Sequence, residues 1–242
     1  MDHNPIKGLA MGNRLLAELP ADELESIAKH FRHVKLELGE VVHEPDQAIH
    51  YVYFPVSSVI SMLYIMENGQ TAEVGLTGRE GVAGSSGYLG DGTPSTRSVA
   101  QVAGDALRMA VKDIEKHFLT CKGFRGVLLK YAQYTIAQIS LTAACNRLHP
   151  VEQQFCRWLL INDDVHRGSK LRMTHELVAN MLGCSRVSVS VTAKKFQDRG
   201  WIRYSRGVIT ITDRPGLEDA VCECYLATIS HYERLFGPLR NG

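Results

Sequence analysis

The sequence predicts an α+β protein: an N-terminal antiparallel β roll, a long helix and a C-terminal winged helix-turn-helix. Three observations support this prediction. Short apolar runs separated by turn residues fill residues 34–109, a helical stretch without proline covers 124–147, and a helical pair followed by a β hairpin covers 174–212. The 242 residues, 45% hydrophobic and 22% charged, suit two modest domains with packed cores.

The chain shows no signal for a membrane or for export. No apolar run approaches the roughly 18 residues of a membrane-spanning helix. The first five residues lack the basic-then-apolar pattern of a signal peptide. We therefore expect a cytoplasmic protein without a membrane partner. Because no nucleophile lies at an interpretable spacing from a base, we do not expect an enzyme or any catalytic residue.

The N-terminal part combines one short helix with a series of strands. Residues 20–33 place Leu24, Ile27, Ala28 and Phe31 at helical spacing. The expected strands are 34–38, 51–54, 59–65, 71–76, 99–102 and 106–110. Asn68-Gly69 between two of them is a strong hairpin signal.

Helical character resumes near Val111, and the long helix that follows carries a regular apolar seam. The seam residues follow one another at spacings of three and four: Leu129, Ala132, Ile136, Ile139 and Ala143. Such a pattern is typical of a seam between two helices, although it could equally pack on the β roll of the same chain. His149-Pro150 should end the helix, because proline clashes with the preceding helical turn.

The segment after residue 173 has the pattern of two helices and a wing. Thr174 can cap a first helix that turns Leu177, Val178 and Met181 inward, and Gly183 permits a sharp turn. Ser185 can cap a second helix that ends near Asp198 and carries the apolar residues Val187, Val191 and Phe196. Two β-like runs, 201–204 and 208–212, flank Ser205-Arg206-Gly207 and predict the hairpin wing.

Basic residues concentrate in this segment. Ten lysines or arginines and three acids lie between Arg167 and Arg214, a net charge of +7 in a chain whose total is +1. Such a block suits phosphate binding. The start of the second helix would meet base edges in the major groove, where Arg186 could read guanine. We expect phosphate contacts from Thr174, Ser185, Ser188, Lys194, Lys195 and Arg206.

The six cysteines lack the paired short spacings of a zinc ribbon or finger. Only Cys222 and Cys224 are close, and they lie in a helical-looking, acidic stretch. We therefore expect reduced thiols that pack as small apolar side chains, and no metal site.

At this point the sequence resembles the Crp/Fnr family of bacterial transcription regulators. Residues 182–186, Leu-Gly-Cys-Ser-Arg, are similar to that family's turn and recognition-helix start, and the order of elements matches over about 15–212. The resemblance implies domains at 1–120 (cyclic-nucleotide-binding-like β roll), 121–147 (dimerisation helix) and 148–242 (DNA-binding domain). It also implies a homodimer on a palindromic operator, with RNA polymerase as a further partner.

The sequence departs from the family in two places. Val187 and Val191 occupy positions of the catabolite activator's acidic and second arginine contacts, so the target sequence should differ and Val187 could contact thymine methyls. In the cyclic-nucleotide cassette the matching residues are Gly84, Ser85, Arg97 and Ser98, with Ser140 nearest to a base contact. The ribose-binding carboxylate is missing.

These departures leave the effector open. We expect little or no cyclic AMP binding and no cofactor. Arg97 could meet a different anionic effector or bridge to an acidic neighbour. The alternative to a sensor is a constitutive DNA-binding protein whose β roll only contacts other proteins.

Overall fold

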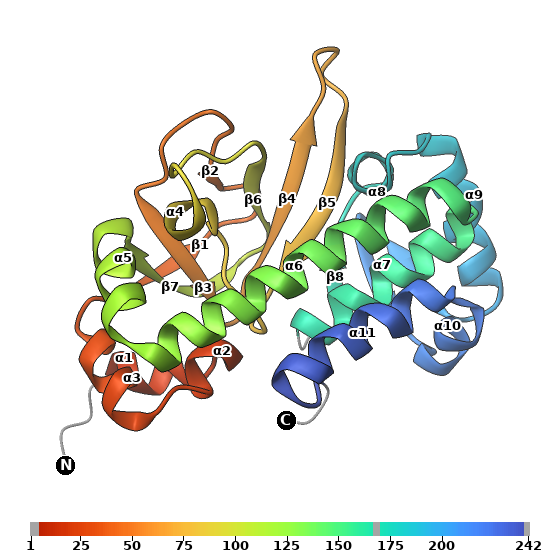
Figure 1. The fold of residues 1–242 in the computed structure, drawn as a ribbon. Coiled ribbons are helices and arrows are strands. Elements are labelled where there is room, and N and C mark those ends of the chain that lie inside the picture. Colours follow the sequence, from red (N-terminus) through yellow and green to blue (C-terminus); the bar gives the residue numbers. More distant parts are fainter. Residues whose placement is uncertain (1–4, 167–169, 240–242) are drawn as a thin grey trace. The chain divides into compact units, whose positions relative to one another are not determined.

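The computed structural model describes residues 5–166 and 170–239. It forms two compact units (Figure 1). The first consists of Met1–Met62 and Leu76–Thr135, and the second of Leu63–Gly75 and Ile136–Gly242. The mixture of helices and antiparallel sheets confirms the predicted α+β class.

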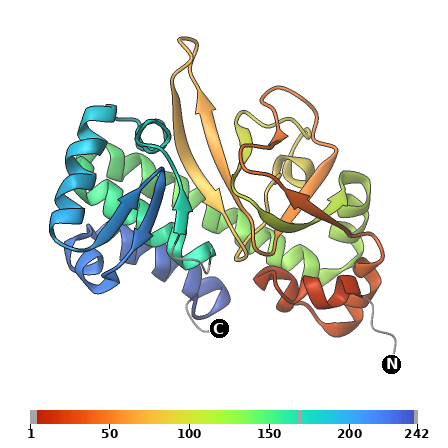
Figure 2. The same ribbon diagram turned by 180° about the vertical axis from the view of Figure 1, so that it is seen from behind.

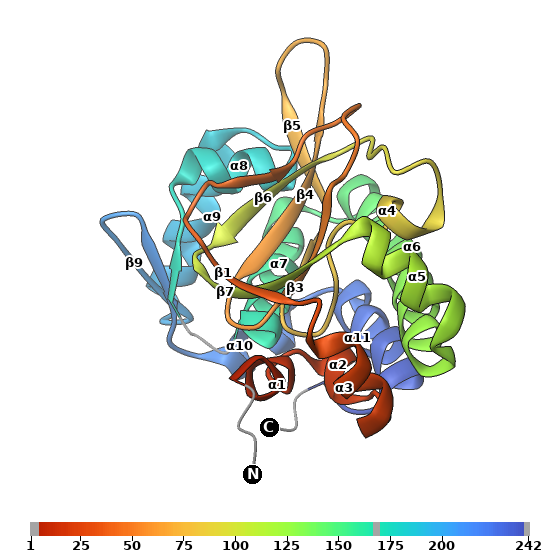
Figure 3. The ribbon, with the colours of Figure 1, turned by 90° about the vertical axis from the view of Figure 1, so that its left-hand side faces the viewer.

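The β roll consists of two sheets, with strand orders β1-β7-β3 and β2-β6-β4-β5. Figure 3 shows the first of these sheets with its strands labelled. The strands are β1 (Arg32–Leu36), β2 (Val41–His43), β3 (Tyr51–Pro55), β4 (Val59–Ile65), β5 (Thr71–Thr77), β6 (Arg97–Val102) and β7 (Gly104–Ala110). All six predicted strands are present. The additional strand, β2, has three residues and an irregular register against β6, so it has no alternating pattern to detect.

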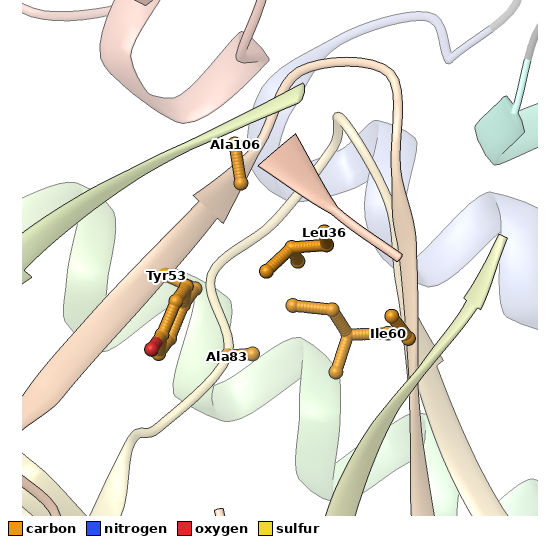
Figure 4. Packing of buried hydrophobic residues seen from close by; sticks show 6 residues of the cluster. Leu36, Tyr53, Ile60, Ala83 and Ala106 are labelled. Carbon is orange, nitrogen blue, oxygen red and sulfur yellow. The ribbon is translucent and has the colours of Figure 1, made fainter. Parts of the chain in front are cut away.

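The core of the roll lies between its strands. Its buried residues are Leu36, Tyr53, Ile60, Ala83, Ala100 and Ala106 (Figure 4). Burial of a leucine or isoleucine stabilises such a core by about 1.5–3 kcal/mol. The predicted hairpin joins β4 to β5, where Gly69 has a φ of +81° that suits glycine.

Short helices accompany the roll. They are α1 (Pro5–Ala10), α2 (Arg14–Ala17), α3 (Ala21–Ala28), α4 (Ser86–Leu89) and α5 (Val111–Thr120). The sequence predicted α3 and α5 but not α1, α2 or α4, which are too short for a helical period to emerge. Buried Asn13 fixes α2, because its side chain accepts from the N–H groups of Leu15 and Leu16 and donates to the carbonyls of Pro55 and Gly81.

The long helix is α6 (Lys122–Leu148). Glu23 caps its start by accepting hydrogen bonds from the N–H groups of Gly123 and Phe124 at 2.9 and 2.8 Å. It ends before Pro150, as predicted, and α7 (Val151–His166) follows. Residues up to Thr135 belong to the first unit and those from Ile136 to the second.

The second unit contains the predicted winged helix-turn-helix. Its elements are β8 (Lys170–Arg172), α8 (His175–Leu182), α9 (Arg186–Asp198), β9 (Ile202–Ser205), β10 (Val208–Ile211), α10 (Arg214–Ala220) and α11 (Glu223–Phe236). The three strands form one antiparallel sheet in the order β8-β10-β9, visible from behind in Figure 2. Within the described residues, no helix combines the length and apolar character that crossing a bilayer requires.

Candidate nucleic-acid interface

The first helix of the pair, α8, is capped and turned as the sequence predicted. The Thr174 hydroxyl accepts a hydrogen bond from the N–H of Leu177 at 3.2 Å. Gly183 ends the helix with a φ of +63°, a conformation that glycine adopts without strain. Val178 and Met181 are buried as predicted, but the inward prediction for Leu177 is wrong: it is 39% exposed, because it lies on the outer side of the first turn.

The second helix, α9, separates a buried face from an exposed one. Ser185 caps it by accepting from the N–H of Ser188 at 3.1 Å. The buried apolar face consists of Val189, Ala193 and Phe196, of which the sequence indicated only Phe196. Val187 and Val191 are 72% and 54% exposed. These two valines form an apolar surface on the outer face of α9 that is not packed in the core.

The wing turns tightly at Arg206 and Gly207. Both have positive φ angles, +50° and +73°, as expected for the two-residue turn that joins twisted antiparallel strands. The Tyr204 hydroxyl donates a 2.6 Å hydrogen bond to the carbonyl of Met173, and the N–H of Met173 donates to the carbonyl of Gly207. The wing is therefore tied to the residue that precedes the Thr174 cap.

An open groove of about 750 Å³ joins these elements. Its lining includes Thr174, Arg186, Lys194 and Arg206 from the predicted set. The lining also includes His175, whose Nδ1 lies 2.8 Å from the Ser190 hydroxyl. Burial, together with the positive charge of Arg186, lowers the pKa of His175. Among the described residues, neither Arg186 nor Arg206 forms an ion pair, so both guanidinium groups are available to a ligand.

The basic block is less uniform than its sequence suggests. Lys195 and Arg199 both donate to Glu152, at 3.1 and 2.7 Å. Partial burial alone would raise the pKa of Glu152, but these hydrogen bonds outweigh it and lower the pKa. Lys195 therefore forms an ion pair with Glu152, and its phosphate-binding role stays a prediction.

Arg214, at the end of the basic block, forms ion pairs that stabilise the fold. It contacts Asp163, Asp164 and Glu218, and it donates to the Tyr225 hydroxyl. Arg167, at the other end of the block, lies outside the described residues.

The cation that the sequence predicted for the cassette of the β roll, Arg97, already has an acidic partner. Arg97 donates a 2.8 Å hydrogen bond to Glu44, the acidic neighbour that the sequence left open as its partner. Gly84 has a φ of +100°, and a Cβ there would lie 2.8 Å from the His43 ring. Ser85 precedes α4, and Ser98 is buried opposite His43 in the sheet.

A cavity of about 280 Å³ lies beside Glu44 and His43. Ser140 belongs to the second unit, where it donates to the carbonyl of Ile136.

The predicted seam of α6 is exposed or half-buried along its length. Leu129 and Ile136 are 46% and 67% exposed, and Ala143 is exposed as well. Ala132 and Ile139 are half-buried. The opposite flank of the helix provides the packing, with Leu128, Tyr131 and Tyr134 fully buried in the first unit.

Comparison with known proteins supports this architecture. Residues 153–220 match the model of the Crp-like helix-turn-helix domain. No curated protein sequence matches the chain significantly. Many solved structures share its fold, and the resemblance to the Crp/Fnr family is therefore confirmed.

Three of these structures show the extent of the likeness. FixK2 from Bradyrhizobium japonicum is 13% identical, with a TM-score of 0.67 over 79% of this chain and 98% of its own. The c-di-GMP responsive global regulator CLP from Xanthomonas campestris is 14% identical, with a TM-score of 0.62 over 79% and 99%. A Crp/Fnr-family transcriptional regulator from Thermus thermophilus is 16% identical, with a TM-score of 0.63 over 78% and 97%. The chain therefore contains a Crp-like helix-turn-helix domain, within a fold similar to that of Crp/Fnr-family regulators.

Proposed function

We propose that the protein is a transcription regulator that binds double-stranded DNA sequence-specifically through α9. The observation that carries this proposal is the outer face of α9, where Arg186 is unpaired among the described residues and Val187 and Val191 are exposed. Two exposed valines beside an unpaired arginine contribute no burial energy to the fold of the single chain. A major groove offers guanine acceptors to the arginine and thymine methyls to the valines.

The remaining contacts position the helix. Ser185, Ser188 and Thr174 lie at helix starts, where hydroxyl and N–H groups can donate to phosphate oxygens. Lys194 and Arg206 line the same groove, and Lys195 is the next residue of α9 after Lys194. Phosphate contacts of this kind fix the register without reading sequence.

We further propose that the protein binds its operator as a homodimer. The exposed seam of Leu129, Ala132, Ile136, Ile139 and Ala143 is the surface that a second copy would cover. Two copies related by a two-fold axis would recognise a palindrome. RNA polymerase is the expected partner of the bound dimer.

For the β roll we propose an anionic effector other than cyclic AMP. The Arg97 guanidinium provides the positive charge, and an anion would have to displace Glu44 from it. A structural relative named for its response to c-di-GMP supports a phosphate-bearing effector in this fold. Ser85 offers no carboxylate for a ribose hydroxyl.

The DNA-binding proposal can be tested without knowing the operator. Sequence selection from random duplexes would provide a site, and fluorescence anisotropy would measure affinity for it and for a scrambled duplex. Arg186→Ala should cost about 1–3 kcal/mol on the selected site and relax base preference at one position of each half-site.

Arg234→Ala provides the matched control, because Arg234 is an exposed arginine of the same unit on α11. It should leave affinity unchanged. Equal losses for Arg186→Ala on the selected and scrambled duplexes would remove Arg186 from base recognition.

A further inference from the structure

Four potential metal ligands converge in the second unit, away from the DNA-reading groove. The ligand atoms of Cys145, His149, Cys222 and Cys224 all lie within 4.8 Å of one another. The Cys145 and Cys222 sulfurs are 3.6 Å apart, and the Cys224 sulfur is 3.6 Å from His149 Nδ1. All three cysteines are free thiols and buried.

We propose that these four residues bind a structural zinc ion. A tetrahedral zinc with Zn–S bonds of about 2.3 Å and a Zn–N bond of about 2.0 Å has ligand–ligand edges of about 3.5–3.8 Å. Both measured separations are 3.6 Å. Three sulfurs and one imidazole nitrogen form one of the common closed ligand sets for structural zinc. Such a set leaves no coordination position for substrate or water, so the site is structural.

The backbone holds each pair of ligands in place. At the end of α6, the N–H of His149 donates to the carbonyl of Cys145 at 3.0 Å. The Gln154 side chain donates to the carbonyl of His149 at 2.7 Å, so both the N–H and the carbonyl of His149 are hydrogen-bonded. Cys222 and Cys224 lie at the start of α11, where Cys222 is the N-cap.

The surroundings compensate the charge of such a site. Three thiolates around Zn²⁺ leave one net negative charge. The start of α11 provides the positive end of a helix dipole. Arg157 is 5% exposed and its Nε lacks a hydrogen-bond partner in the described part of the chain. The positive charge of Arg157 is close enough to interact electrostatically with Cys145.

The His149 imidazole also faces a carboxylate, as zinc-bound histidines often do. If Nδ1 of His149 coordinates the metal, Nε2 carries the proton and faces a carboxylate oxygen of Glu223 at 3.4 Å. Such a carboxylate fixes the tautomer and raises the basicity of the ligand.

The zinc would join two segments that are far apart in the chain. Cys145 and Cys222 are separated by 77 positions. One pair of ligands ends α6 just before Pro150, and the other begins α11, which packs along α7 (Figure 1). Helix α11 lies beyond the residues that match the helix-turn-helix family model. The metal would therefore fasten a C-terminal helix to the point where α6 passes into the DNA-binding helices.

The test measures zinc in the full-length protein purified under reducing conditions. Elemental analysis after gel filtration should find one zinc per chain. Replacement by Co²⁺ should produce the visible absorption of tetrahedral cobalt and a thiolate-to-cobalt charge-transfer band. Removal of the zinc by a chelator should lower the unfolding temperature, because binding free energy contributes to folding.

Variants identify the ligands. Cys145→Ser, Cys222→Ser and His149→Ala should each lose stoichiometric zinc, and Glu223→Gln should weaken zinc binding by about 10-fold. Cys156→Ser is the matched control, since Cys156 is an equally buried cysteine of α7 outside the cluster, and it should retain the zinc.

Two results would overturn the proposal. One is a reduced wild-type protein that holds no zinc and gives no tetrahedral cobalt spectrum, a measurement that does not depend on any variant folding. The other is a purified protein in which Cys145 and Cys222 are joined as a disulfide, shown by a peptide mass two hydrogens lower.

Discussion

Two arginines of the same basic segment differ in their environment: one stabilises the fold, and the other is open to a ligand. Arg214 is held by Asp163, Asp164 and Glu218, whereas Arg186 lines the open groove and is unpaired among the described residues. The two aspartates lie about 50 positions before Arg214 in the chain. Counting charges along the sequence could locate the basic block but could not separate its structural members from those free to meet DNA.

Glu80 is a second residue whose role appears only in the fold, and it predicts a pH dependence. It is fully buried after β5, where both its oxygens accept from the N–H of Gly78. Burial raises its pKa to about 7, against the opposing effect of the Gly78 hydrogen bonds.

Because this pKa is higher in the folded chain than in the unfolded one, the stability contributed by protonated Glu80 is fully present at low pH. It is lost as pH rises through about 7. Glu80→Gln cannot ionise, so its free energy of unfolding relative to wild type should increase by about 1–3 kcal/mol between roughly pH 5 and pH 8. Urea unfolding across this range measures the difference. Parallel pH curves for the two proteins would show that folding does not raise the pKa of Glu80.

At the scale of elements, sequence periodicity succeeded where an element was long and failed where it was short. Helix α6, the helix pair, six strands of the roll and the two strands of the wing were predicted, because each has at least one face in a packed core. On α9 the sequence indicated three apolar residues without showing which face they share. The fold buries Phe196 with Val189 and Ala193, and leaves Val187 and Val191 outside.

The exposed seam of α6 leads to a prediction about assembly. Ile136 is 67% exposed in the single chain and would be buried between two copies. Ile136→Asp would place a charge in that dry interface, where its desolvation outweighs any gain. Sedimentation should show a dimer for wild type at micromolar concentration and a monomer for Ile136→Asp, with palindrome binding lost.

Lys130→Asp is the control for this experiment. Lys130 is exposed on α6 outside the seam, and its substitution changes the charge by more than Ile136→Asp does. It should remain dimeric. A wild-type protein that sediments as a monomer would refute the assignment of the seam.

Across the whole molecule, features set by neighbouring residues could be predicted from the sequence, and features set by long-range contacts could not. The cap, turn and wing of the DNA-reading unit are local, and the sequence predicted them within a residue or two. The cluster of Cys145, His149, Cys222 and Cys224 was missed, because its ligands come from two segments that only the fold brings together. Two local signals were available: Cys145 and His149 lie one helical turn apart, and Cys222 and Cys224 are close in the sequence.

Recognition of base edges by α9 would take place in the major groove, twice per operator. Methylation protection of guanine N7 on a selected duplex tests it most directly, because N7 lies in the major groove. We predict two protected guanines, related by two-fold symmetry and about 10 base pairs apart, or a multiple of that spacing, both losing protection in Arg186→Ala. Protection that persists in Arg186→Ala, or that is confined to the minor groove, would show that Arg186 does not read guanine in the major groove.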